Sequence, residues 1–256
     1  MGNDNRPFIL TKGSFTSTGR YTAATAHTNN ERSWSSLYFG LQSVLRSQMF
    51  GLPLSGTDVC GYKSSGDNLD EELCLRWYQL ATFFPLARHS QDATGARTEP
   101  YMFKTYQNQV KKTMHDRMQY LRLLYTCMFE TTDSGGTCLD PIEFRYAVSS
   151  DKFKSQLPDV TNSFLFAGSL LVSPIMNATN GATTFSAYFP AGNWVNMADW
   201  TVVQGKDDYV QLNVQDTVNV HLAPGALIPF QNNSNMALMT SADTIQAPIT
   251  LIANRD

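Results

Sequence analysis

Hydrophobic and polar positions change their spacing near residue 138, which divides the chain into two parts. Before it, apolar positions recur at helical spacing in long segments, and short apolar runs lie between them. The predicted helices span residues 34–50, 69–84 and 106–131, and the predicted extended segments span residues 6–11, 20–27, 52–57 and 84–88. Strands that alternate with helices are typical of parallel β/α units, but a closed barrel of such units needs eight strands.

The part after residue 138 has short apolar strands separated by frequent turn signals. The predicted strands span residues 164–166, 169–172, 184–189, 209–214, 218–222 and 249–252. Strict alternation of apolar and polar residues is clearest over residues 218–222. We therefore predict an α/β domain over residues 1–137 and an antiparallel β-sandwich over residues 138–256.

Composition narrows the class of protein. The chain has 256 residues, of which 42% are hydrophobic, so it can bury a sizeable core and is not disordered. Its net charge of −3 argues against a basic surface for nucleic acid. No apolar run reaches the roughly 18 residues that a membrane-spanning helix needs.

Four cysteines fall into two local pairs, Cys60 with Cys74 and Cys127 with Cys138. Neither pair has the short spacing of a zinc site. An even number of cysteines beside N-glycosylation sequons, which occur at Asn177 and Asn232, favours disulfides and an oxidising compartment, either extracellular or a lysosome-like lumen. The alternative is four buried thiols and two chance sequons.

Metal and cofactor chemistry has little support. His27 and His115 have no second ligand at useful spacing, and His221 in the alternating strand is interpreted as a hydrogen-bonded structural residue. No phosphate-binding glycine loop and no Gly-x-Ser-x-Gly serine nucleophile motif is present. We expect no metal and no cofactor.

Several segments together resemble glycoside hydrolase family 31, the α-glucosidases of the maltase-glucoamylase, sucrase-isomaltase and acid α-glucosidase group. They occur in family order over nearly the whole chain. The segments are RPFILTKGSF (6–15), GRY (19–21), FGLPLSGTDVCGY (50–62), ELCLRWYQL (72–80), FFPLAR (83–88), YFPAGNW (188–194) and TVNVHLAPGALIP (217–229).

The resemblance implies the second half of a (β/α)8 TIM-type barrel followed by the family's proximal C-terminal β-sandwich. The family's N-terminal β domain, its early barrel strands with the nucleophilic aspartate, and its distal C-terminal domain have no counterpart here. A half-barrel leaves strand edges open. We therefore expect another polypeptide, either an N-terminal half or a separate subunit, to complete the barrel.

The family's acid/base aspartate follows a his-trp-x-gly-asp stretch. Counting back from Ser33 and Trp34 places Asn29 there, with Asn30 as the alternative because the loop differs by one residue. An amide cannot donate a proton to a leaving oxygen. Glu31 is the only nearby carboxylate, and we interpret it as a solvated surface residue rather than a replacement acid.

Other substrate positions also depart from the family pattern. Lys12 replaces an arginine, Ser90 aligns with a histidine, and the tryptophan before the acid/base residue is replaced in the 25–26 region. The remaining substrate-binding candidates are Asp58, Tyr62 and Arg88. Asp58 and Arg88 are interpreted mainly as a buried ion pair, with weak binding of sugar hydroxyls as the alternative.

The two cysteine pairs differ in their support. The pairing of Cys60 with Cys74 matches a family disulfide pattern, whereas the resemblance does not extend to Cys127 and Cys138.

Three functions remain as hypotheses. The first is a catalytically degenerate α-glucosidase-like chain that serves as a structural or assembly component, with residual carbohydrate binding to an α-glucan or oligosaccharide. The second is a subunit or processed fragment of an active, retaining α-glucosidase whose nucleophile another chain supplies. The third is a carbohydrate-binding module centred on Tyr62 and Trp194.

Overall fold

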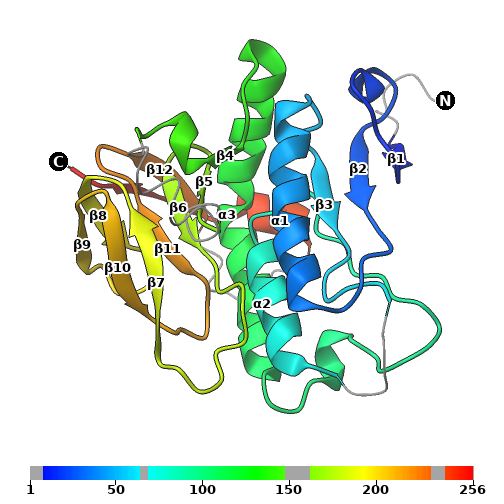
Figure 1. Cartoon of the computed structure of the whole chain (residues 1–256). Helices are drawn as coiled ribbons and strands as arrows, with labels where there is room; N and C mark the ends of the chain where they lie inside the picture. Colours follow the sequence, from blue (N-terminus) through cyan, green and yellow to red (C-terminus); the bar gives the residue numbers. More distant parts are fainter. Residues whose placement is uncertain (1–7, 64–68, 148–161, 232–239, 256) are drawn as a thin grey trace. The chain divides into compact units, whose positions relative to one another are not determined.

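The computed structural model describes residues 8–63, 69–147, 162–231 and 240–255 (Figure 1). The chain forms two compact units, Met1–Gln107 and Asn108–Asp256. Among the described residues, none of the helices combines the length and the hydropathy that crossing a membrane requires. The predicted domain boundary after residue 137 stays a prediction.

The first unit is built on a parallel sheet with the order β1 (Leu10–Thr11), β2 (Ala24–His27), β3 (Ser55–Thr57) (Figure 1). A 3-10 turn η1 (Thr18–Arg20) precedes β2, and α1 (Trp34–Met49) connects β2 to β3. After β3 follow α2 (Glu71–Ala81) and η2 (Pro100–Met102). The expected alternation of parallel strands with helices is confirmed.

The segment around residues 84–88 runs beside β3. The N–H of Leu86 donates to the carbonyl oxygen of Ser55 (3.1 Å), and that of Val59 donates to the carbonyl oxygen of Arg88 (2.8 Å). Asp58 and Arg88 form a parallel bridge. A Cβ on Gly56 would lie 1.7 Å from the carbonyl oxygen of Leu86, so only glycine permits this approach.

Both helices of this unit begin where the sequence supplies a cap. The Ser33 hydroxyl accepts from the Ser36 N–H at the start of α1, and the Asp70 carboxylate accepts from the Leu73 N–H at the start of α2 (3.0 Å). Glu71 adds a second role, because its carboxylate accepts the backbone N–H groups of residues 104, 105 and 106. Burial alone would raise the pKa of Glu71, but these hydrogen bonds outweigh it and lower the pKa.

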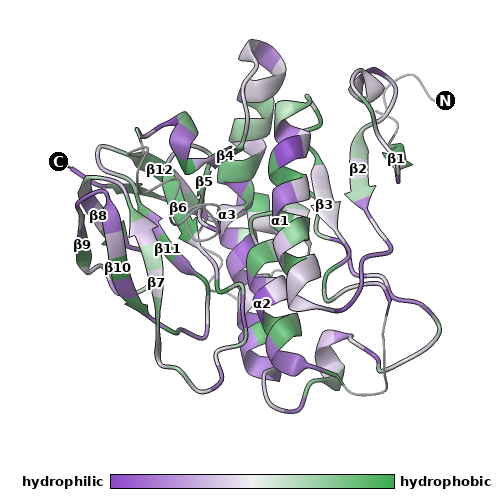
Figure 2. Cartoon of the chain, viewed as in Figure 1, coloured by the Kyte–Doolittle hydropathy of each residue, from purple (hydrophilic) through white to green (hydrophobic). Residues whose placement is uncertain are grey.

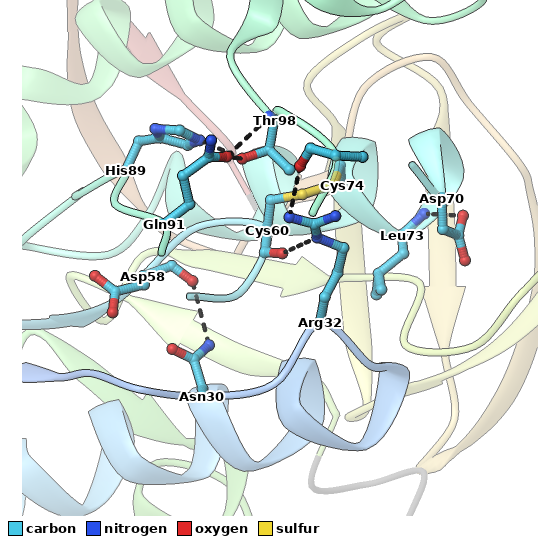
Figure 3. The surroundings of a disulfide bond; sticks show 11 residues. Asn30, Arg32, Asp58, Cys60, Asp70, Leu73, Cys74, His89, Gln91 and Thr98 are labelled. Carbon is cyan, nitrogen blue, oxygen red and sulfur yellow. Dashed lines mark hydrogen bonds between the residues drawn. A yellow bond between two sulfur atoms is a disulfide. The ribbon is translucent and has the colours of Figure 1, made fainter. Parts of the chain in front are cut away.

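A disulfide joins Cys60, after β3, to Cys74 in α2 (Figure 3). The Arg32 guanidinium donates to the carbonyl oxygens of Cys60 (3.3 Å) and Ala96 (3.1 Å), so three loops meet beside this disulfide. The cysteines are separated by 14 positions in the sequence.

We expect the double substitution Cys60→Ser, Cys74→Ser to lower the free energy of unfolding by about 3 kcal/mol, because a crosslink across a loop of this length restricts the unfolded chain by about that amount. Denaturant unfolding of the variant, with reduced wild-type protein as the control, measures the loss. An unchanged midpoint would show that the crosslink does not stabilise the fold.

The second unit begins with α3 (Gln107–Ser134) and continues mainly as antiparallel strands. A six-stranded sheet has the order β4-β5-β6-β11-β8-β9, and two-stranded sheets pair β10 with β7 and β12 with β13. The elements are β4 (Leu139–Pro141), η3 (Ile142–Phe144), β5 (Phe164–Phe166), β6 (Leu170–Ser173), β7 (Thr184–Phe189), β8 (Gly192–Asn196), β9 (Val202–Gly205), β10 (Asp208–Asn213), β11 (Asn219–Leu222), β12 (Leu227–Gln231), α6 (Ser241–Gln246) and β13 (Ile249–Ala253). A disulfide between Cys127 and Cys138 ties α3 to the segment before β4.

The core of this unit contains residues of both the six-stranded sheet and the β7–β10 pair. Leu165, Leu171, Tyr188 and Trp194 belong to one buried cluster. Trp194 is 0% exposed, and its indole N–H donates to the carbonyl oxygen of Pro190 (2.9 Å). A fully buried indole cannot stack on a sugar, so Trp194 cannot take part in the binding module expected at Tyr62 and Trp194.

Strand β11 corrects a second expectation. The strand expected over residues 218–222 forms between β6 and β8, and all four of its residues are buried, with the ring of Phe189 packed 4.8 Å from the ring of His221. His221 was expected to be hydrogen-bonded, yet neither ring nitrogen has a hydrogen-bond partner among the described residues. Burial lowers the pKa of His221 to about 4, against the opposing charge of Asp199.

Candidate functional site

The candidate site lies at the edge of the parallel sheet where the strands of the first unit end. Lys12 follows β1, the loop of residues 28–30 follows β2, and Asp58 follows β3. Because parallel strands all run in one direction, their carboxyl ends share an edge, which is where binding groups collect in β/α folds. The structure thus places most of the candidate residues at the same edge.

Asp58 is a buried acidic residue at this edge of the parallel sheet. Its side chain is 0% exposed and lies 3.3 Å from Nε of Arg88, whose side chain is 34% exposed. Burial raises the pKa of Asp58, and the charge of Arg88, the N–H of Asn29 and the charges of His89 and Lys12 oppose that rise. The ion pair expected from the sequence is present.

The pairing leaves acceptor capacity at Asp58. Neither carboxylate oxygen accepts a well-aligned hydrogen bond from the described residues. Figure 3 shows the carboxylate pointing away from the Cys60–Cys74 disulfide. Because the Asp58 side chain is 0% exposed, these acceptor positions are open to a donor such as a hydroxyl group only where the loops around Asp58 move apart.

The loop after β2 is fixed to the loop after β3 through Asn30. The Asn30 amide donates to the backbone carbonyl of Asp58 (3.2 Å), as Figure 3 shows. The backbone carbonyl of Asn30 accepts from the N–H groups of Tyr62 (2.9 Å) and Lys63 (3.0 Å). Asn29 is exposed and has a φ of 64°, in the left-handed region. Neither side chain titrates, so this loop offers no proton donor of the carboxylic type.

Glu31 and Tyr62 are placed differently from Asp58. Glu31 is exposed and pairs through its backbone with Lys63, whereas Tyr62 is half-buried. These positions agree with the interpretation of Glu31 as a surface residue.

Ser90 is half-buried, while the neighbouring His89 belongs to a polar network that sequence reasoning missed. Nε2 of His89 lies 2.6 Å from Oγ1 of Thr98, which donates to Oε1 of Gln91 (2.6 Å) (Figure 3). Because the Thr98 hydroxyl has one proton and donates it to Gln91, it accepts from His89, so Nε2 carries the imidazole proton. Burial lowers the pKa of His89, although Glu99, Asp58 and the Thr98 hydrogen bond oppose the change.

The other histidines supply no metal site. Nε2 of His27 lies 2.9 Å from the hydroxyl of Ser47, which itself donates to the carbonyl oxygen of Ser43. Burial lowers the pKa of His27. Within the part of the chain that the structure describes, no group of three or more potential ligands could hold a metal ion. Of the two sequons, Asn177 is exposed, and Asn232 lies outside the described residues.

Comparison with known proteins matches both parts of the chain to the same family. Residues 1–127 match the model of the glycosyl hydrolases family 31 TIM-barrel domain, and residues 135–228 match the glycosyl hydrolase family 31 C-terminal domain. An alpha-glucosidase of Hordeum vulgare is 35% identical over 239 residues, covering 92% of this chain and 26% of the relative. The lysosomal alpha-glucosidase of Mus musculus is 31% identical over 267 residues, covering 96% of this chain and 26% of the relative.

Solved structures share the fold. A glucosidase II alpha subunit superposes with a TM-score of 0.82 at 21% identity, covering 98% of this chain and 26% of that one. A family 31 dextranase of Flavobacterium johnsoniae superposes with a TM-score of 0.83 at 23% identity, covering 99% of this chain and 31% of that one. The chain thus spans about a quarter of the length of the curated relatives it matches.

Proposed function

The chain belongs to glycoside hydrolase family 31, and we propose that it contributes later barrel strands and the following β domain to an α-glucosidase-like protein that has lost its general acid. It would then serve as a structural or assembly component, with residual binding of an α-glucoside. The observation that supports this proposal most directly is the amide side chain of Asn30 at the edge of the sheet beside Asp58.

The backbone of the loop favours Asn30 over Asn29 as the residue at the acid/base position. The family stretch has a glycine immediately before its catalytic aspartate, and a left-handed backbone conformation favours glycine or asparagine. Asn29 has that conformation, with a φ of 64°. Asn29 therefore corresponds to the glycine and Asn30 to the aspartate, which moves the tryptophan of the family stretch from the expected 25–26 region to His27.

The chemistry of the family explains why this substitution matters. A retaining glycosidase needs two carboxyl groups about 5–5.5 Å apart, one as nucleophile and one as acid and then base. The family's nucleophile lies on an earlier barrel strand than those present here. Without a proton donor the sugar leaving group departs as an alkoxide. The rate of glycoside hydrolysis is then lower by roughly 10²–10⁴-fold.

Residual sugar binding would rest on Asp58 and Arg88. The partly exposed Arg88 can donate to a sugar hydroxyl, and the buried Asp58 carboxylate would accept a hydroxyl where the loops around it move apart. A carboxylate beside a guanidinium is a common arrangement for binding neighbouring sugar hydroxyls.

The Asp58–Arg88 pair also has a structural consequence that can be measured. We expect Arg88→Met to lower the free energy of unfolding. The loss should be smaller than the roughly 3–5 kcal/mol that follows when one partner of a fully buried ion pair is removed, because Arg88 is partly exposed. The double substitution Asp58→Asn, Arg88→Met should lose less than the sum of the two single substitutions, since it leaves no unpaired charge. Additive losses in denaturant unfolding would show that the pair does not contribute.

Strand β1 lies at an edge of the described parallel sheet, and this position supports the proposal that further strands complete the barrel. β1 pairs with β2 only, among the described strands, and apolar side chains beside it are exposed, with Phe8 at 62% and Phe15 at 81%. In Figure 2, β1 has the hydrophobic colour over part of its length. The unpaired backbone groups of an exposed apolar edge strand can form hydrogen bonds with a further strand. We propose that the missing barrel strands, in the same polypeptide or in another one, cover this edge.

The compartment follows from the disulfides and the relatives. Two disulfides are present, and relatives of this chain include lysosomal alpha-glucosidases. We propose the lumen of the secretory pathway, including the lysosome or the extracellular space, as its location.

The proposal is tested by two substrates with different leaving groups. The whole protein that contains this chain should not hydrolyse maltose above background, because its leaving group needs a proton. α-Glucosyl fluoride needs no such proton, so its hydrolysis reports whether the nucleophile is present. Efficient turnover of maltose would overturn the proposal.

A working α-glucosidase is the second candidate, and one observation favours it. Burial raises the pKa of Asp58, which is the property of a general acid. In that case Asp58→Asn abolishes maltose hydrolysis while α-glucosyl fluoride is still cleaved. If the first proposal holds, Asp58→Asn instead weakens binding of an α-glucoside without a turnover to abolish.

A further inference from the structure

The hairpin of β8 and β9 presents a tryptophan in a strained backbone conformation. Trp200 lies in the loop between the two strands, has a φ of 63° and is 57% exposed. The left-handed region is unfavourable for a bulky side chain, and glycine or asparagine normally occupies such a position in a loop. Because more than half of the Trp200 side chain stays exposed, burial in the fold does not explain why tryptophan is here. Strain of this kind is a reason to look for a function of the side chain.

Backbone hydrogen bonds hold the loop in this shape. The N–H of Trp200 donates to the carbonyl oxygen of Asn196 (2.9 Å), and the N–H of Asn196 donates to the carbonyl oxygen of Thr201 (2.8 Å). The N–H of Met197 donates to the carbonyl oxygen of Val220 in β11 (2.9 Å), which ties the loop to the six-stranded sheet. The loop thus presents the Trp200 indole from a fixed backbone.

A carboxylate directly precedes the indole. Asp199 is exposed, and its Oδ1 accepts from the hydroxyl (2.6 Å) and the N–H (3.0 Å) of Thr201. These two hydrogen bonds lower the pKa of Asp199, so the carboxylate is ionised at neutral pH. Because both bonds use Oδ1, Oδ2 can accept from a molecule outside the loop.

An exposed indole beside a carboxylate fits a sugar ring. A pyranose has an apolar C–H face, which can stack on an indole, and an edge of hydroxyl groups, which can donate to a carboxylate. Among the described residues of this hairpin, the large apolar side chains that are exposed are Trp200 and Val202 (60%). Two side chains offer far less area than the roughly 800 Å² per partner of a stable protein interface. The hairpin therefore favours a small ring over a protein surface.

We propose that the β8–β9 hairpin binds a chain of α-linked glucose, with one ring stacked on Trp200 and one hydroxyl donating to Asp199. The choice of glucose rests on the α-glucoside binding proposed above. The hairpin itself needs neither a proton donor at Asn30 nor the acceptor at Asp58. This inference is therefore independent of the proposed loss of catalysis.

The test measures the retention of the whole protein by soluble starch in native affinity electrophoresis. Trp200→Gly should weaken starch binding roughly 5- to 30-fold, the range for residues that carry most of a binding energy. Glycine and asparagine suit the left-handed backbone, so Trp200→Gly and Trp200→Asn should both leave the unfolding midpoint unchanged or raise it. Asp58→Asn should leave most of the starch binding in place. Phe129→Ala removes an aromatic side chain of α3 that is 68% exposed, and this matched control should leave starch binding unchanged.

Four results would overturn the proposal. The first is a whole protein that starch does not retain, as expected if a neighbouring domain covers Trp200. The second is an equal loss in Phe129→Ala, which indicates non-specific adhesion. The third is a lower unfolding midpoint in both Trp200 variants, which gives the indole a packing role. The fourth is a loss of starch binding in Asp58→Asn but not in Trp200→Gly, which places the glucan at the sheet edge and agrees with the proposed function alone.

Discussion

Asn30→Asp, made in the whole protein, should raise the rate of maltose hydrolysis by roughly 10²–10⁴-fold, the contribution of a general acid to such reactions. The substitution keeps the size of the side chain and supplies a carboxyl group where the amide now stands beside Asp58. The nearby Asp58 carboxylate should also hold the new acid protonated to higher pH, since two like charges at one site disfavour ionisation.

Asn29→Asp is the matched control for this gain of function. Asn29 is exposed and left-handed, one residue from the proposed position. The Asn29→Asp substitution should produce no comparable increase in the rate of maltose hydrolysis. If Asn29→Asp restores turnover and Asn30→Asp does not, the assignment of the acid/base position moves to Asn29. If neither does while α-glucosyl fluoride is cleaved, the loss of activity has a cause other than the missing acid.

The second large effect is a loss of stability in acid that originates at His221. Its pKa is about 4 in the folded protein and 6.5 in the unfolded chain, so between these values the unfolded chain binds a proton that the folded protein does not. Folding stability is therefore complete above pH 6.5 and falls as the pH drops toward 4. The two pKa values correspond to a loss of about 3 kcal/mol.

Denaturant unfolding at several pH values tests this expectation with two variants. His221→Phe should flatten the decline between pH 6.5 and 4, because it removes the titrating group. Asn219→Leu, at a buried and non-titrating position of the same strand, should change stability by the same amount at every pH. If His221→Phe retains the full decline, the acid sensitivity arises elsewhere.

Much of the fold follows from patterns along the chain. The helix expected over residues 34–50 forms as Trp34–Met49, and the strand expected over residues 184–189 forms with those bounds. Both segments have clear periodicity and definite ends, a serine cap before the helix and turn residues around the strand. Strands β4, β8, β9 and β12 were not predicted, because they lie beside turn residues and lack clear alternation.

The reasons for the two wrong expectations are tertiary. The alternation over residues 218–222 predicts a strand, but only the packing over its face, where Phe189 contacts His221, shows that the polar residue His221 is buried. Likewise, the sequence shows only that Trp194 is an aromatic residue near turns. Its burial follows from the packing of the six-stranded sheet against the β7–β10 pair.

The sequence likewise predicts some features of the candidate site, while others depend on the folded structure. The positions of Asp58 and Arg88 at the ends of successive extended segments predicted their pairing. The choice between Asn29 and Asn30 needed a backbone angle that the sequence does not specify. The contact of His89 with Thr98 joins residues nine positions apart through a loop that has no periodicity to predict it.

The most direct test of the central claim is a structure of the whole protein with an α-glucoside bound beside Asp58. We predict that the side chain facing the family nucleophile across the glycosidic oxygen is the amide of Asn30. A carboxyl group of Asp58, Glu31 or another residue, about 5–5.5 Å from that nucleophile and in contact with the glycosidic oxygen, would contradict the loss of the general acid.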